Sequence, residues 1–132
     1  MTQRFGIDTS ILVRLVTGDP EDCFARCVEA LTGLVDREGA EVYASNQVIG
    51  EAYVAIQHHY GVPKAEARAA LVSVLRSGIV KPLNGADAFS ALEATGGCGL
   101  LDRLIADDYR RAGLTTLTLD RAMGALAGTR RL

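Results

Sequence analysis

Two aspartates each follow a short apolar segment of the kind that forms a buried strand. Asp8 comes directly after residues 4–7, and Asp120 comes directly after residues 114–119. In an open parallel sheet, ligands bind beyond the carboxyl ends of the strands. One acid in such a place could simply cap the helix that follows it. Two of them favour a binding site, because neighbouring carboxylates raise each other's pKa unless a cation is present.

Two further acids lie inside apolar stretches with helical spacing. Glu51 lies within residues 48–56, and Asp102 lies within residues 100–106. Neither has a lysine four residues further on that could pair with it. Burying an unpaired charge is costly, so metal coordination is a reason to expect an acid there. Asp107 and Asp108, on the other side of the second helix, are expected to face solvent.

Four carboxylates without a thiolate or an imidazole beside them make a site of hard oxygen ligands, which suits Mg²⁺ or Mn²⁺. Such metals can activate water and neutralise charge on a phosphate. Other chemistries lack their residues: the chain has no Gly-x-Ser-x-Gly elbow. Its glycine-rich segment, residues 96–99, lacks the lysine of a phosphate-binding loop. The three cysteines show no Cys-x-x-Cys spacing and are expected to be reduced thiols.

The elements that must position these acids alternate along the chain. Hydrophobic periodicity and capping residues indicate strands and helices separated by short breaks. Strands are predicted at 4–7, 41–44, 79–81 and 114–119, and helices at 9–16, 20–37, 47–60, 63–75, 84–95, 100–111 and from 120 onward. Strands joined through helices form parallel sheets. We therefore predict an α/β fold, a three-layer α/β/α domain with a central, mostly parallel sheet of four or five short strands.

Bulk properties are those of one globular domain spanning residues 1–132. Hydrophobic residues make up 48% of the chain and charged residues 23%, and no apolar run approaches the roughly 20 residues of a membrane-spanning helix. The N-terminus lacks a signal-peptide layout, so a cytoplasmic protein is expected. The formal net charge is −2, which does not favour nucleic-acid binding. Residues 101–132, however, carry six arginines and four aspartates, a local balance of +2.

The order and setting of the four acids resemble those of a known family. Each motif is weak alone, but four in this order and spacing are fairly specific, and together they span nearly the whole chain. The segments Ile7–Arg14, Ser45–Tyr53, Leu101–Ala106 and Thr116–Arg121 look like those of a PIN domain. Within that family the likeness is greatest to VapC-type ribonuclease toxins of bacterial toxin–antitoxin pairs.

The resemblance implies roles for individual residues. Asp8 and Asp102 would be the principal metal ligands, and Glu51 and Asp120 would complete the acidic cluster and help to position the attacking water. Two hydroxyl residues match positions that support the site, Thr9 and Thr118. It also implies Mg²⁺- or Mn²⁺-dependent endonucleolytic cleavage of RNA, with tRNA or another structured RNA as a target. The implied partners are a second copy of the chain and a small VapB-like antitoxin whose basic side chain blocks the carboxylate pocket.

The chain departs from the family pattern at two places. Many relatives carry a further acid after the last motif, where this chain has Ala122. Arg103 stands where small or apolar residues are frequent, and we treat Arg103 and Arg121 as candidate RNA contacts or surface residues. The alternative to a nuclease is a catalytically silent PIN-like module that binds RNA or protein. A phosphatase or receiver domain using Asp8 is disfavoured, because the second aspartate of such a phosphatase and the late lysine of a receiver are missing.

Overall fold

The computed structural model describes residues 2–132 and contains two small parallel sheets. The first sheet has the order β1-β2-β3, and its strands are β1 (Arg4–Gly6), β2 (Glu41–Ala44) and β3 (Lys81–Pro82). The second pairs β4 (Thr116–Thr118) with β5 (Thr129–Arg131). Parallel strands need long crossovers, and helices supply every one of them.

Helices connect and surround the strands. They are α1 (Thr9–Thr17), α2 (Glu21–Thr32) with the π-helical turn η1 (Gly33–Arg37), α3 (Asn46–Tyr60), α4 (Lys64–Leu75), α5 (Ala86–Glu93), α6 (Leu100–Arg111) and α7 (Arg121–Gly124). No helix among residues 2–132 has the length and apolar character needed to cross a membrane.

One large hydrophobic core joins the first sheet to the helices. Among its most deeply buried members are Leu12 of α1, Val42 of β2, Ile49 and Ile56 of α3, and Leu71 of α4, each no more than 1% exposed. These positions recur at helical or alternating spacing, so each element presents one apolar face to the core. The same packing fixes the ends of β1 and β2, from which α1 and α3 start.

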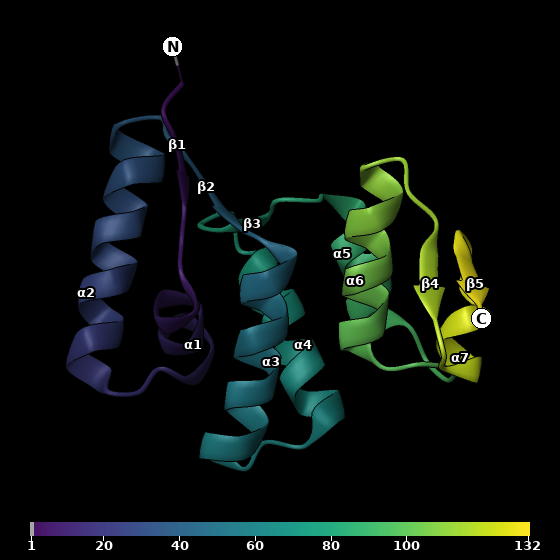
Figure 1. Cartoon of the computed structure of the whole chain (residues 1–132). Coiled ribbons are helices and arrows are strands. Elements are labelled where there is room, and N and C mark those ends of the chain that lie inside the picture. The colour runs from purple at the N-terminus through teal and green to yellow at the C-terminus, as the bar shows by residue number, and fades with distance from the viewer. Residues whose placement is uncertain (1) are drawn as a thin grey trace.

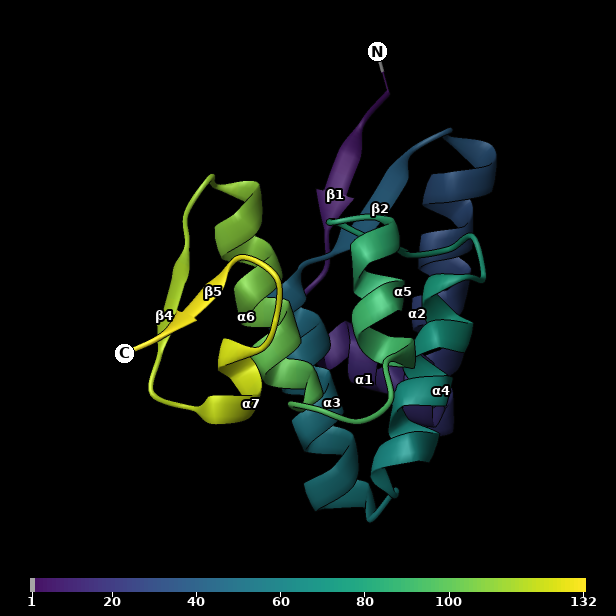
Figure 2. The same ribbon diagram turned by 90° about the vertical axis from the view of Figure 1, so that its right-hand side faces the viewer.

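The C-terminal unit, which we define as residues 114–132 with β4, α7 and β5, lies on the far side of α6 from β1. Both views show this separation (Figures 1 and 2). The unit packs on α6 through a second, much smaller cluster made by Cys98, Ala106, Met123 and Leu126. Its leucines at 114, 117, 119 and 132 are 55% to 78% exposed.

The predicted α/β class with parallel strands is confirmed, and most predicted elements are present within a few residues. The strands are divided differently from the prediction, which placed them in one sheet. β4 pairs with β5 and not with the first sheet. The segment Thr129–Arg131, where no strand was predicted, is a strand. Its two arginines leave no apolar pattern from which a strand could be predicted, because an exposed strand needs no apolar face.

Candidate active site

Asp8 lies directly beyond β1 and caps α1. Its Oδ1 accepts hydrogen bonds from the Ser10 hydroxyl at 2.6 Å and from the Ile11 amide at 3.2 Å. The Ser10 hydroxyl, followed by the Ile11 amide, lowers the pKa of Asp8 below its ordinary value. The side chain is exposed. Asp8 therefore carries a negative charge at neutral pH, and both contacts leave its Oδ2 available to a further ligand.

Glu51 comes to the same end of the sheet from the second turn of α3. The Ser45 side chain accepts a hydrogen bond from the Val48 amide and caps this helix directly beyond β2. The Thr9 hydroxyl donates to Glu51 Oε1 at 3.4 Å, which links Glu51 to the residue after Asp8. The structure thus brings Asp8, Thr9 and Glu51 together, although the burial expected for Glu51 is wrong and its side chain is exposed.

Asp120 repeats the arrangement of Asp8 in the second sheet. It follows β4, and its Oδ2 accepts a hydrogen bond from the Met123 amide at 2.7 Å, so it caps α7. The Thr118 hydroxyl accepts a hydrogen bond from the Asp120 amide at 3.0 Å. Capping thus occurs at both aspartates. Because β4 belongs to a separate sheet, Asp120 does not share a sheet edge with Asp8.

Asp102 lies in the first turn of α6 and is half-buried. An open groove of about 590 Å³ runs between α6 and α3, and Glu51 is one of the residues that line it. The residues of α6 that face this groove are Leu101, Leu104, Ile105 and Asp108. Asp102 is about 100° round the helix from Leu101 and does not line the groove. Glu51 therefore lines the groove and Asp102 does not.

The side chains of these acids are of the chemical type that binds a divalent cation, but too few of them lie close together to hold one. Carboxylate and hydroxyl oxygens are the donors that Mg²⁺ and Mn²⁺ prefer. Within residues 2–132, however, no group of three or more acidic, histidine or cysteine side chains lies close enough to hold a metal ion. Thr9 links Glu51 to the residue after Asp8, and neither Asp102 nor Asp120 joins them in a group of three. In this conformation the four-acid site is incomplete.

The two candidate RNA contacts differ in their surroundings. The Arg103 guanidinium donates from Nε to the Cys98 carbonyl at 3.2 Å and from a terminal nitrogen to the Gly96 carbonyl at 2.8 Å. Arg103 therefore orders the glycine-rich loop before α6. Arg121, the first residue of α7, is exposed.

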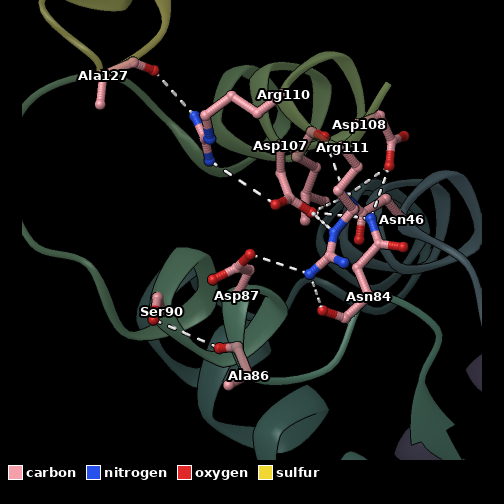
Figure 3. A network of polar contacts seen from close by, with 11 residues as sticks. Asn46, Asn84, Ala86, Asp87, Ser90, Asp107, Asp108, Arg110, Arg111 and Ala127 are labelled. Carbon is pink, nitrogen blue, oxygen red and sulfur yellow. Dashed lines mark hydrogen bonds and ion pairs between the residues drawn. The ribbon is translucent and has the colours of Figure 1, made fainter. Parts of the chain in front are cut away.

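The sequence interpretation missed a buried polar network centred on Asp107, which is 2% exposed (Figure 3). Asn46 Nδ2 donates to Asp107 Oδ2 at 3.0 Å, and Asn84 Nδ2 donates to the same oxygen at 2.8 Å. The prediction that Asp107 faces solvent is wrong. Its spacing held the signal, because it lies seven and three residues after the buried Leu100 and Leu104 and therefore on their face of α6.

Comparison with known proteins agrees with the motifs. The model of the PIN domain family matches residues 6–128, which is nearly the whole chain. A search of curated proteins finds no significant match.

Proposed function

The chain belongs to the PIN-domain family, generally a nuclease fold, and we propose that it is an endoribonuclease dependent on Mg²⁺ or Mn²⁺. The observation that carries the proposal is the junction of Asp8, Thr9 and Glu51 at the carboxyl end of the first sheet, inside the matched region. This edge is where open parallel sheets bind their ligands.

Each residue of the junction has a chemical part in the proposal. Asp8 is ionised, and the Ser10 hydroxyl and the Ile11 amide both donate to its Oδ1, so its Oδ2 can attract and hold a cation. Thr9 orients the Glu51 carboxylate, which can position a water molecule or take its proton. A divalent cation bound there would supply charge neutralisation at the scissile phosphate. Asp102 and Asp120 are proposed as the further members of the set.

The direct test is cleavage of total bacterial RNA by the purified chain with Mg²⁺, with Mn²⁺ or with a chelator. Discrete fragments that need the metal and vanish in Asp8→Asn are the expected result. Asparagine caps a helix as well as aspartate does, so this variant keeps the fold of α1. Equal cleavage by Asp8→Asn, or cleavage unaffected by chelator, would overturn the proposal.

We further propose that the chain is the toxin of a type II toxin–antitoxin pair. The support is the likeness of its four motifs to VapC-type toxins, which also implies a homodimer, a structured RNA such as tRNA and a small VapB-like antitoxin. Growth arrest on expression in a bacterium, relieved by Asp8→Asn, is the expected outcome. Normal growth with abundant folded protein that cleaves RNA in vitro would separate the nuclease from the toxin role.

The second candidate is a catalytically silent PIN-like module that binds RNA or protein. Two observations favour it: the residues 2–132 hold no assembled group of three metal-binding side chains, and Ala122 replaces a family acid. RNA binding that is unaffected by chelator and yields no fragments would support this reading over the nuclease.

A further inference from the structure

The first sheet ends at β1, and the second edge of β1 pairs with no strand among residues 2–132. The Ile7 amide donates to the Tyr43 carbonyl of β2 at 2.9 Å. Neighbouring residues of a strand direct their backbone groups to opposite sides, so those of Gly6 point toward the free edge. Such an edge is a template on which another chain can add a strand.

An open groove of about 510 Å³ runs along β1. It is lined by Phe5 and Ile7, by Tyr43 of β2 and by Leu83, which is 54% exposed. A strand added to the edge of β1 would lie beside this groove and could bury an apolar side chain in it. The free edge thus offers both backbone hydrogen bonds and an apolar surface.

β4 is a second strand with a free edge, and it carries exposed leucines. Thr116 and Thr118 direct their backbone toward β5, through a bond from the Thr116 amide at 3.0 Å and one to the Thr118 carbonyl at 2.9 Å. The backbone of Leu117, which lies between them, therefore points away from β5. The side chains of Leu117 and Leu119 are 58% and 78% exposed. β4 thus presents unpaired backbone groups together with apolar side chains that are largely uncovered.

The two free edges match each other in length and in apolar pattern. β1 and β4 each have three residues, and each ends two residues before an aspartate that caps a helix. Parallel pairing in this register would set Phe5 beside Leu117 and Ile7 beside Leu119. Because side chains alternate along a strand, these four apolar side chains would share one face of the sheet.

The same register would bring the two capping aspartates together. Asp8 and Asp120 would stand opposite each other, with their Cα atoms about 4.8 Å apart, which is the spacing of adjacent strands. Thr9 already links Glu51 to the residue after Asp8. Pairing of β4 with β1 would therefore gather three of the four expected acids at one sheet edge.

The chain's own β4 is held away from its own β1, as Figures 1 and 2 show. Leu100 and Leu104, which are 1% and 3% exposed, anchor α6 in the large core. The C-terminal unit is attached to α6 by the small cluster that contains Met123 and by a hydrogen bond from Arg110 to the Ala127 carbonyl at 3.1 Å. Pairing within one chain would break these contacts, whereas a second copy can present β4 with all of them intact.

Charge also favours a contact between copies. The C-terminal unit carries three arginines and one aspartate, a net charge of +2, whereas residues 1–113 carry 11 basic and 15 acidic side chains, a net charge of −4. Surfaces of opposite charge steer two chains toward each other. The C-terminal unit of one copy is thus attracted to the remainder of another.

We propose that the free edge of β1 is a docking surface for β4 of a second copy of the chain, so that Asp120 of the second copy joins Asp8 and Glu51. The inference rests on the proposed function and names the partner that its site requires. Exchange in both directions closes a two-fold dimer and leaves neither strand with a free edge. Two carboxylates at this spacing repel each other unless a cation lies between them, so a divalent cation strengthens the dimer. Without the cation, we expect the chain to be mostly monomeric.

Sedimentation velocity of the full chain, with Mn²⁺ or with a chelator, tests the docking surface. We expect dimers with Mn²⁺ and mostly monomers with the chelator. Leu117→Lys places a charge on the free edge of β4 and should abolish the dimer. Leu132→Lys is the matched control: it adds the same charge at a leucine of the same unit that is 75% exposed but lies outside β4, and it should leave the dimer unchanged. Both side chains are exposed, so both variants should keep the fold.

RNA cleavage by mixed variants tests whether Asp120 acts across the dimer. Asp8→Asn and Asp120→Asn are mixed as monomers before Mn²⁺ is added, and each is impaired alone. In a mixed dimer one site has both aspartates and the other has neither. About half of the dimers then carry one intact site, so the mixture should regain about one quarter of the wild-type rate. If Asp120 acted within its own chain, mixing would give only the mean of the two separate rates.

The outcomes separate the docking surface from the nuclease. Only the mean rate on mixing, or wild-type cleavage by a chain that stays monomeric with Mn²⁺, would overturn the inference and leave the proposed function standing. A dimer that survives Leu117→Lys would also overturn the inference. A wild-type chain that forms dimers sensitive to Leu117→Lys but yields no RNA fragments would support the docking surface and overturn the nuclease. A chain that neither dimerises nor cleaves RNA would overturn both.

Discussion

The two ends of the molecule place an aspartate in nearly the same local setting but in very different surroundings. Asp8 and Asp120 each follow a parallel strand and each accept the amide three residues on to cap a helix. Asp8 stands on a core of 20 buried residues, whereas the C-terminal unit rests on three. Segments with few buried apolar contacts open at low free energy. A strand followed by a capping aspartate therefore positions a carboxylate only as firmly as the core beneath it holds the strand.

The largest expected effect is on RNA cleavage when Asp8, the acid beside the first sheet, is replaced. Asp8→Asn should lower RNA cleavage by about 100- to 1000-fold, since a bound metal contributes several kcal/mol and each 1.36 kcal/mol is tenfold in rate. Asp120→Asn, from the loosely held unit, should lower it less. Initial rates of cleavage of a defined RNA measure both, and thermal unfolding should show unchanged stability because asparagine preserves each cap. A greater loss at Asp120 would reverse the comparison.

Core truncations should show the same contrast in stability. Leu12→Ala removes a fully buried side chain from the large core and should cost about 2–5 kcal/mol of unfolding free energy. Met123→Ala, in the small cluster, should cost about 1–2 kcal/mol, because a site with few neighbours collapses more easily. Urea unfolding followed by circular dichroism measures both values. Equal losses would show that the C-terminal unit is as firmly packed as the first sheet.

Low pH should weaken the attachment of α6, the helix that lies between the first sheet and the C-terminal unit. The folded pKa of Asp107 lies below its unfolded value of about 3.9, so the stabilisation is fully present above that pH and is lost as pH falls through the folded pKa. Unfolding free energy should therefore decline below about pH 4 in the wild-type chain and decline less steeply in Asp107→Ala. Parallel curves for the two proteins would contradict the burial of an ionised Asp107.

Much of this could be predicted from the sequence where local and tertiary signals agree. Apolar periodicity and capping residues located α1, α3 and α6, and the cap at Asp8 was one of the two roles considered for that residue. The pairing of β4 was missed because its partner β5, only 13 residues further on, is a mostly exposed strand with two arginines and no apolar pattern. The spacing of Asp107 indicated its burial, but the partners that hold its carboxylate there could not be predicted, because Asn46 and Asn84 lie 61 and 23 residues away.

The smallest expected effect is at the outer face of the C-terminal unit. Leu117 of β4 is 58% exposed, so Leu117→Thr, which keeps a strand-forming residue, should change the unfolding free energy by no more than about 0.5 kcal/mol. Urea unfolding at two protein concentrations measures it. A loss above about 1 kcal/mol would show that this face is covered in solution. A loss that grows with protein concentration would show that a second copy of the chain covers this face. A loss that is independent of protein concentration would show that another part of the same chain covers β4, an arrangement in which Asp120 approaches Asp8.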